Sequence, residues 1–161
     1  MAKEIDIDIS KCTGCEYCEL VCSFTHHDEF NPLKSRIHVS VFIDRSMAVP
    51  VVCYQCEDPW CAKACPAGAI SVDKSLSDGA TAVMVQEDKC VGCRMCTLAC
   101  PFGCITVSDG HAVKCDLCRG DPQCVKVCRA GALRFAEPQS GVAAKRKTVA
   151  ERLLKSYEEG K

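Results

Sequence analysis

Apolar and polar residues alternate in several short stretches of the chain, and this two-residue period predicts β-strands. The alternation is clearest in residues 4–9 (EIDIDI) and in residues 36–42 (RIHVSVF), where β-branched side chains strengthen it. Two further stretches predict hairpins. One covers residues 71–89, with strand-like SVD and ATAVMVQ on either side of a KSLSDG turn. The second covers residues 105–113 and reverses at an Asp-Gly pair.

A different pattern begins after Ala136. Residues 142–159 predict one amphipathic helix, because Val149, Leu153 and Tyr157 recur at a spacing of four residues. Such a helix either folds back on its own domain or docks onto a larger subunit.

Cysteine is the residue type that changes this picture most, since it supplies 17 of the 161 residues. Sixteen of them fall into four runs of four: Cys12, Cys15, Cys18 and Cys22; Cys53, Cys56, Cys61 and Cys65; Cys90, Cys93, Cys96 and Cys100; and Cys115, Cys118, Cys124 and Cys128. The third run has the spacing C-x2-C-x2-C-x3-C followed by proline. Bacterial ferredoxins hold cubic iron–sulfur clusters with this spacing.

In such a run the first three thiolates wrap around one cluster, and the fourth reaches a neighbouring cluster. Each run therefore needs a partner run. Pro66 and Pro101 follow the second and third runs, whereas Ser23 and Arg129 follow the first and fourth. This difference favours a nested pairing, second with third and first with fourth. A sequential pairing would also combine one regular with one expanded run, so the residues alone leave both pairings open.

A disulfide-stapled secreted scaffold and a zinc-stabilised module both fit the cysteine pattern less well. The secreted scaffold would need an export signal, and the opening MAKEIDIDIS has neither a long apolar core nor a twin-arginine pair. The zinc module would hold each ion with two separated C-x2-C pairs. We therefore expect reduced thiols, iron–sulfur clusters and a cytoplasmic location. No apolar run is long enough to predict a membrane span.

An internal repeat follows the fourth cysteine of the last three runs. Its three copies are PAGAISV, PFGCITV and RAGALRF. Each copy has glycine at the same place, and we expect it to close a short helix in a left-handed conformation before the next strand. Cys104 stands where Ala69 and Ala132 stand in the sister copies, so we expect a buried small side chain and not a ligand.

Residues 23–35 are predicted to form a loop. This loop and the strand after it carry His26, His27 and His38. Ligation of a cluster is one alternative for these histidines, and a surface or packing role is the default, because each cluster already has four thiolates. Trp60 lies in the longer loop of the second run and is expected to cover the edge of a cluster, with partner docking as the alternative.

With all sixteen cysteine positions matched, residues 5–135 resemble the four-cluster, ferredoxin-like electron-transfer subunits of anaerobic oxidoreductases. The resemblance implies four [4Fe-4S] clusters and the nested pairing. The implied ligands are Cys12, Cys15, Cys18 and Cys128 for cluster one; Cys22, Cys115, Cys118 and Cys124 for cluster two; Cys53, Cys56, Cys61 and Cys100 for cluster three; and Cys65, Cys90, Cys93 and Cys96 for cluster four.

The resemblance also implies an α+β fold: a tandem, bacterial-ferredoxin-like dicluster fold with short strands and short helices around the clusters, plus a C-terminal helix. The double domain would cover residues 1–135. One half would combine residues 1–50 with 106–135, and the second would be residues 51–105. Residues 136–161 would form an extension with the docking helix.

The function implied by the resemblance is an electron wire and not an enzyme. The chain offers no nucleophile, acid–base pair or phosphate loop, so the catalytic site is expected on a partner. Residues 12–39 and the short length most resemble the small subunit of tungsten aldehyde oxidoreductase-type enzymes, which include benzoyl-coenzyme A reductases. We expect the chain to lack the export signal and membrane anchor of the longer relatives, which counts against the periplasmic reductase subunits.

The partners implied are a large tungsten-pterin catalytic subunit and a flavin-containing NADH-linked subunit. Clusters near both ends of the chain would also let its copies stack into a longer wire. Subunits of carbon monoxide dehydrogenase, hydrogenase or formate dehydrogenase are alternatives, and so is a free polyferredoxin. The formal net charge of −1 gives no electrostatic reason to expect nucleic acid as a partner.

Overall fold

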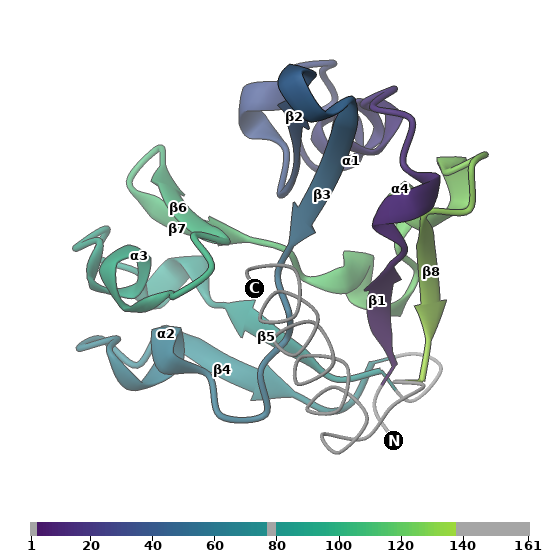
Figure 1. Ribbon diagram of the computed structural model, residues 1–161. Coiled ribbons are helices and arrows are strands. Elements are labelled where there is room, and N and C mark those ends of the chain that lie inside the picture. Colours follow the sequence, from purple (N-terminus) through teal and green to yellow (C-terminus); the bar gives the residue numbers. More distant parts are fainter. Residues whose placement is uncertain (1–2, 77–79, 138–161) are drawn as a thin grey trace, which may run out of the picture.

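The computed structural model describes residues 3–76 and 80–137, which form short strands and short helices (Figure 1). The strands are β1 (Glu4–Ile7), β2 (Ile37–Phe42), β3 (Met47–Val52), β4 (Ile70–Asp73), β5 (Ala82–Val85), β6 (Ile105–Ser108), β7 (His111–Lys114) and β8 (Leu133–Ala136). The α-helices are α1 (Tyr17–His27), α2 (Trp60–Lys63), α3 (Met95–Ala99) and α4 (Gln123–Val127). Single 3-10 turns lie at η1 (Ile9–Lys11), η2 (Pro32–Lys34), η3 (Ile43–Arg45), η5 (Glu87–Lys89) and η6 (Leu117–Gly120). The predicted α+β class is confirmed.

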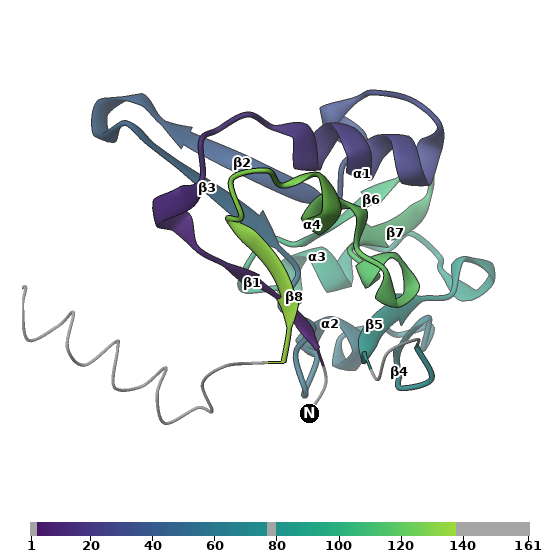
Figure 2. The same ribbon diagram turned by 90° about the vertical axis from the view of Figure 1, so that its right-hand side faces the viewer.

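The strands pair two by two in antiparallel sheets: β1 with β8, β2 with β3, β4 with β5 and β6 with β7. Three of these pairs join strands that are neighbours in sequence. The fourth joins the two ends of the described chain, with Ile7 opposite Leu133. An ion pair of 2.7 Å between Arg134 and Asp6 lies on the same pair of strands. The first and last cysteine runs are therefore brought to one side of the molecule (Figures 1 and 2).

The predicted strands near the N-terminus and at residues 36–42 are present as β1 and β2, and both predicted hairpins are present as β4–β5 and β6–β7. The sequence pattern did not predict β3, because Pro50 lies inside it and proline cannot donate to a strand ladder. In a sheet of two strands every strand is an edge, and Pro50 sits opposite Val39 in β2. The sheet therefore accommodates proline without losing the pair.

The loop predicted for residues 23–35 was wrong at its start, because α1 continues to His27. Proline does not follow Cys22, so the helix is free to continue past the fourth cysteine, although α4 of the fourth run, which also lacks the proline, ends at Val127. The hydroxyl of Ser23 donates to the carbonyl of Leu20 at 2.9 Å and accepts from the amide of Asn31 at 3.1 Å. Ser23 is fully buried and joins the end of the helix to the segment that follows it.

The apolar core consists of two groups of buried residues. One is built on Ile37, Val52, Leu117 and Leu133 from the α1, α4, β1, β8 and β2–β3 part of the molecule. The second is built on Ile70, Val83, Cys96, Ile105 and Ala112 from the part with α2, α3 and the β4–β5 and β6–β7 hairpins. Both groups include cysteines of the four runs, so the packing of the apolar core also fixes the positions of these thiols.

The predicted amphipathic helix at residues 142–159 lies outside the described residues, as does most of the predicted extension. Within the described ranges, the longest helix is α1 with 11 residues, and none is long and apolar enough to cross a bilayer.

The repeat glycines Gly68, Gly103 and Gly131 have φ values of +60°, +64° and +67°, which confirms the left-handed conformation expected of them. The amide of each donates to the carbonyl of the fourth cysteine of its run, at 3.2, 3.4 and 3.1 Å. The helices end before that cysteine, at Lys63, Ala99 and Val127. The glycine therefore closes the turn around the fourth cysteine and not the helix itself.

Gly92 in the third run is expected to tolerate alanine less well than Gly68 does. Both have positive φ, at +63° and +60°, so each alanine carries a backbone strain of about 1–2 kcal/mol. Only at Gly92 would the new Cβ meet backbone, since it would lie 2.5 Å from the carbonyl oxygen of Gly110. We predict that Gly92→Ala lowers the midpoint of thermal unfolding by several degrees more than Gly68→Ala, measured anaerobically on the metal-loaded protein. Equal midpoints would contradict the close contact of this loop with the β6–β7 turn.

Candidate functional site

Left-handed residues between the cysteines shape the loops of the runs. In the first run these are Gly14 and Glu16, with φ of +69° and +57°, and in the third run they are Gly92 and Arg94, with φ of +63° and +64°. They stand at matching positions in the two runs: the glycine directly precedes the second cysteine, and the other residue directly follows it. Left-handed residues next to ordinary ones turn successive backbone N–H groups toward one side, which is the geometry of an anion-binding nest. Each loop then enters the short helix that carries the third cysteine.

The first set of cysteines comes from the two ends of the chain. Cys12, Cys15, Cys18 and Cys128 line one cavity. The β1–β8 pairing and the packing of α1 on α4 bring these ends together. Cys18 is buried, and this burial raises the pKa of its thiol to about 12.

The second set, made of Cys22, Cys115, Cys118 and Cys124, is the most deeply buried. Burial raises the pKa of Cys115 to about 12. Burial also raises the pKa of Cys124, and the remaining three thiols of the set raise it further because ionised neighbours repel one another. These four sulfurs therefore lie within electrostatic reach of one another.

The third and fourth sets line two further cavities. Cys53, Cys56, Cys61 and Cys100 line one of them, and Cys65, Cys90, Cys93 and Cys96 line the next. The third cavity is also lined by Trp60, whose side chain is 61% exposed. Trp60 is thus placed between this cavity and solvent.

Cys104 lines the third cavity too, although its sequence position predicts a buried small side chain. It is half-buried, whereas Ala69 and Ala132 are 0% and 2% exposed. Its thiol donates to the carbonyl of Phe102 at 3.4 Å, and burial raises its pKa to about 12. Cys104 is therefore less buried than expected, and its thiol is neutral at ordinary pH.

Backbone amides donate to one sulfur in each of the four runs. The amide of Arg36 lies 3.3 Å from Sγ of Cys22, and that of Ala69 lies 3.3 Å from Sγ of Cys65. The amide of Ala112 lies 3.3 Å from Sγ of Cys90. The amide of Leu117 lies 3.5 Å from Sγ of Cys115. Such bonds stabilise negative charge on sulfur.

The donor set fits an iron–sulfur cluster at each of the four places. Sulfur ligands in groups of four are what four-iron clusters require. Burial raises the pKa of at least one thiol in each set, Cys18, Cys115, Cys61 and Cys96 among them, yet backbone N–H groups point at several of the sulfurs. A bound metal cluster resolves that conflict, because it supplies the positive charge that lets all four thiolates form together.

The sets follow one another through the molecule. Cys18 of the first set and Cys124 of the second interact electrostatically, as do Cys115 of the second and Cys53 of the third. Cysteines of the third and fourth sets pack against one common apolar core. The order is first, second, third, fourth.

Charged residues lie beside the second set, and the spacing of the cysteines does not predict them. Asp116 forms an ion pair with Arg36 at 3.0 Å, and its Oδ1 lies 3.6 Å from Nε2 of His26. Nε2 of His26 lies 3.9 Å from Sγ of Cys118, and burial, helped by Arg36, lowers its pKa. Of the three histidines considered as ligands, His26 is thus the one that approaches a predicted ligand, while His38 is exposed on β2.

Lys114 is a second residue that the cysteine motifs do not reveal. It is 4% exposed and lines the cavity of the third set. The alternation of β7 could have revealed it, because Ala112 and Lys114 lie two residues apart in a strand and so face the same side.

The first and fourth sets, at the two ends of this order, contain the exposed cysteines. Cys15 in the first set and Cys93 in the fourth are exposed, whereas Cys22, Cys115 and Cys124 in the second are buried.

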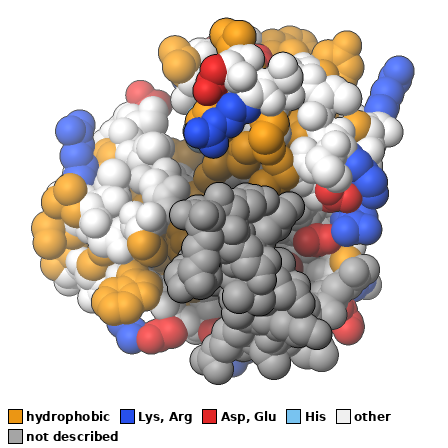
Figure 3. Space-filling view, in the orientation of Figure 1, with side chains coloured by type: hydrophobic (Ala, Val, Ile, Leu, Met, Phe, Trp, Pro, Cys, Tyr) orange, Lys and Arg blue, Asp and Glu red, His pale blue; other side chains and the backbone are white. Residues whose placement is uncertain are grey.

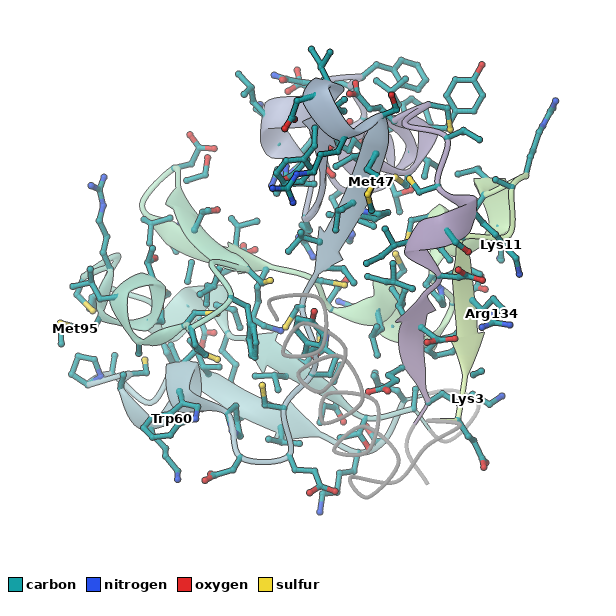
Figure 4. All side chains as sticks on the ribbon, in the orientation of Figure 1. Lys3, Lys11, Met47, Trp60, Met95 and Arg134 are labelled. Atoms are coloured by element: carbon teal, nitrogen blue, oxygen red, sulfur yellow. The ribbon has the colours of Figure 1, made fainter. Side chains whose placement is uncertain are left out.

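Hydrophobic side chains gather on the outer face of the part with α2 and α3 (Figure 3), where Figure 4 places Trp60 and Met95. Leu98 of α3 is 82% exposed.

Comparison with known proteins agrees with this chemistry. Residues 45–138 match the family model described as a 4Fe-4S dicluster domain. The chain is 43% identical to the aliphatic sulfonate oxidoreductase, polyferredoxin-like subunit of Pyrococcus furiosus over 120 residues, which cover 73% of this chain and 66% of that protein. It is 36% identical to the electron transport protein HydN of Escherichia coli, over 83% of this chain and 87% of HydN.

A third relative, the putative oxidoreductase UacF of Escherichia coli, is 37% identical over 93% of this chain but only 24% of its own length. The chain thus spans about a quarter of UacF and about two thirds of the Pyrococcus subunit. Among solved structures, the active site complex BamBC of benzoyl coenzyme A reductase, in complex with benzoyl-CoA, is 28% identical with a TM-score of 0.49, over 96% of this chain and 89% of that one.

The matched residues include the last three cysteine runs, and the relatives share a described role in electron transport or as a polyferredoxin-like subunit. The chain belongs to the 4Fe-4S dicluster domain family and is an iron–sulfur electron-transfer protein.

Proposed function

We propose that this chain is a wire of four [4Fe-4S] clusters that carries electrons between a catalytic oxidoreductase subunit and a second redox partner. The proposed ligands are those of the nested pairing: Cys12, Cys15, Cys18 and Cys128 for cluster one; Cys22, Cys115, Cys118 and Cys124 for cluster two; Cys53, Cys56, Cys61 and Cys100 for cluster three; and Cys65, Cys90, Cys93 and Cys96 for cluster four. The clusters supply one-electron redox chemistry when they are bound.

The observation that carries the proposal is the grouping of the cysteines. Three of the four nested sets each line a cavity of their own. The members of the remaining set interact electrostatically around Cys124. In each set the fourth cysteine of one run joins the first three of a partner run, as the ferredoxin pattern requires. A sequential pairing would leave Cys100 outside the second run's set, but Cys100 lines the cavity of Cys53, Cys56 and Cys61.

The chain's own residues would place the clusters and control access to them. The buried second set would keep its cluster away from water, and the exposed Cys15 and Cys93 would bring clusters one and four close to the surface. Electrons would then enter at one of these ends and leave at the opposite one. We propose two halves for the domain, one with clusters one and two and the second with clusters three and four. The β6–β7 hairpin at their boundary packs into the second core.

The partner proposed first is a catalytic subunit of the tungsten aldehyde oxidoreductase type, with a flavin-containing subunit at the opposite end. The support is the Pyrococcus relative, which is described as a subunit of an oxidoreductase. A stand-alone electron carrier is the second candidate, and a specific observation favours it. The match to HydN, which is described as an electron transport protein, covers 87% of HydN.

Serine substitutions test the ligand sets, because serine removes the thiolate that iron requires with little change in volume. We predict that Cys56→Ser and Cys100→Ser each abolish the same one of the cluster EPR signals and lower the iron content by up to about a quarter. Cys118→Ser should abolish a different signal. As the control, Cys104→Ser should retain the iron and all signals. The nested assignment is wrong if the signal lost with Cys100→Ser is the one lost with Cys118→Ser.

Anaerobic affinity purification from the native cell, with metal analysis and mass spectrometry, tests the partner. Tungsten together with a large pterin-containing subunit is the expected result. Nickel in the complex would instead assign the chain to a carbon monoxide dehydrogenase or hydrogenase. Iron alone, with no second protein after crosslinking, would favour the stand-alone carrier.

A further inference from the structure

Lys114 is a buried cation inside the proposed wire. Its side chain is 4% exposed and forms part of β7, directly before Cys115 of the second set. Nζ donates to the carbonyl oxygens of Val83 at 2.6 Å and Cys115 at 2.8 Å, and it lies 3.4 Å from Oε1 of Gln55. These hydrogen bonds fix the ammonium group at one place.

All three of these acceptors are neutral oxygens. A buried ammonium group without an anion is costly, because hydrogen bonds to neutral groups replace only part of its lost hydration. Among the described residues, no carboxylate forms an ion pair with Lys114. Glu87 and Asp116 line a neighbouring cavity with it, but Asp116 is paired with Arg36. A four-iron cluster with four thiolate ligands is an anion and would supply the balancing charge.

The cavity beside Lys114 is the one proposed to hold such an anion. Lys114 lines it together with Cys53, Cys56, Cys61 and Cys100. Burial raises the pKa of Cys61, and among the groups that oppose this rise the Lys114 ammonium has the largest effect. Lys114 also acts on Cys115 of the second set. The lysine therefore stands between the second and third sets and lines the cavity of the third.

Reduction adds one negative charge to a cluster, so a fixed positive charge beside it makes reduction more favourable. The effect is strong where the charge is shielded from water and weak at an exposed site. Net charge is one of the factors that set the potential of an iron–sulfur cluster. Lys114 is suited to this role because it lines the third cavity, is buried and has no ion-pair partner among the described residues.

We propose that Lys114 is a redox-tuning residue, whose buried charge raises the reduction potential of cluster three above the value that its four thiolates would give alone. This inference rests on the proposed function, since it requires a cluster in the third cavity. Cluster three would thereby hold an electron in the interior of the wire, away from both exposed ends, until a partner takes it.

The test is a redox titration of the full-length, cluster-loaded protein, monitored by EPR under anaerobic conditions. The signal of cluster three is identified by its loss in Cys56→Ser. Lys114→Gln removes the charge but keeps a donor group. We expect its cluster three to be at least tenfold harder to reduce at a given potential, which is a shift of about 59 mV to lower potential for a one-electron couple. Lys114→Arg retains the charge and should restore the potential.

Lys63→Gln is the matched control. Lys63 lies 5.7 Å from the ring of Trp60, which lines the same cavity, but its side chain is 58% exposed and pairs with Asp58. Solvent and the carboxylate screen its charge, so its removal should leave the midpoint of cluster three unchanged. An equal shift in both glutamine variants would overturn the inference, because burial of Lys114 would then not be what matters.

The inference is also overturned if Lys114→Gln binds as much iron and sulfide as the unaltered chain and cluster three keeps its midpoint. If Lys114→Gln fails to bind clusters, Gln55→Glu provides the second test. It places a carboxylate against Nζ, neutralises the lysine where it stands and should lower the same midpoint, whereas an unchanged midpoint would overturn the inference. A different failure, in which the unaltered chain holds no reducible cluster, would overturn the proposed function.

Discussion

The constraint on which the structure depends is the burial of thiols, several of which have raised pKa values and ionise only when a metal binds them. The described apolar cores are small, and each contains cysteines of the four runs among its buried or packed members. Burial raises the pKa of Cys18 and Cys115 to about 12, so these groups contribute as thiolates only when iron is bound. Cluster binding and folding are therefore coupled in this chain. The short strands and helices connect the loops that place the sulfurs.

The burial of the cluster sites also requires the fold to compensate negative charge. Each bound cluster adds negative charge to an interior that is poorly hydrated, and the fold must compensate for it. Backbone amides do this at Cys22, Cys65, Cys90 and Cys115. The left-handed residues in the loops help to aim such amides. Lys114 adds a full charge at one place, so compensation is uneven along the series of sets. An uneven distribution of charge is what allows chemically identical clusters to differ in potential.

The spacing of the cysteines predicted four runs of metal-ligand type, because the geometry of a cubic cluster fixes how far apart its ligands lie in the chain, but it left the pairing of the runs open. The repeat predicted the left-handed Gly68, Gly103 and Gly131 for a similar local reason. Alternation predicted the two later hairpins. Features that depend on distant contacts were less accessible. The pairing of β1 with β8 joins residues 4–7 to 133–136, and no local pattern specifies it.

The failures have physical causes as well. The expected loop after Cys22 is helical to His27, because Ser23 can complete a turn where proline would end it. The half-buried position of Cys104 reflects the cavity beside it, which a comparison with Ala69 and Ala132 could not reveal. Lys114 was not predicted, since charged residues are expected on the surface and only strand alternation places it inward. The catalytic partner depends on surfaces of a second protein, and the sequence of this chain does not encode its identity.

Four four-iron clusters in one chain are the central claim, and counting iron, sulfide and electrons tests it most directly. The measurement is iron and acid-labile sulfide analysis of the anaerobically purified protein, followed by a reductive titration of the same sample. Four clusters predict about sixteen iron atoms and about sixteen sulfides per chain, with uptake of about four electrons. About eight iron atoms and about two electrons would contradict the claim, because half of the cysteine sets would then hold no cluster.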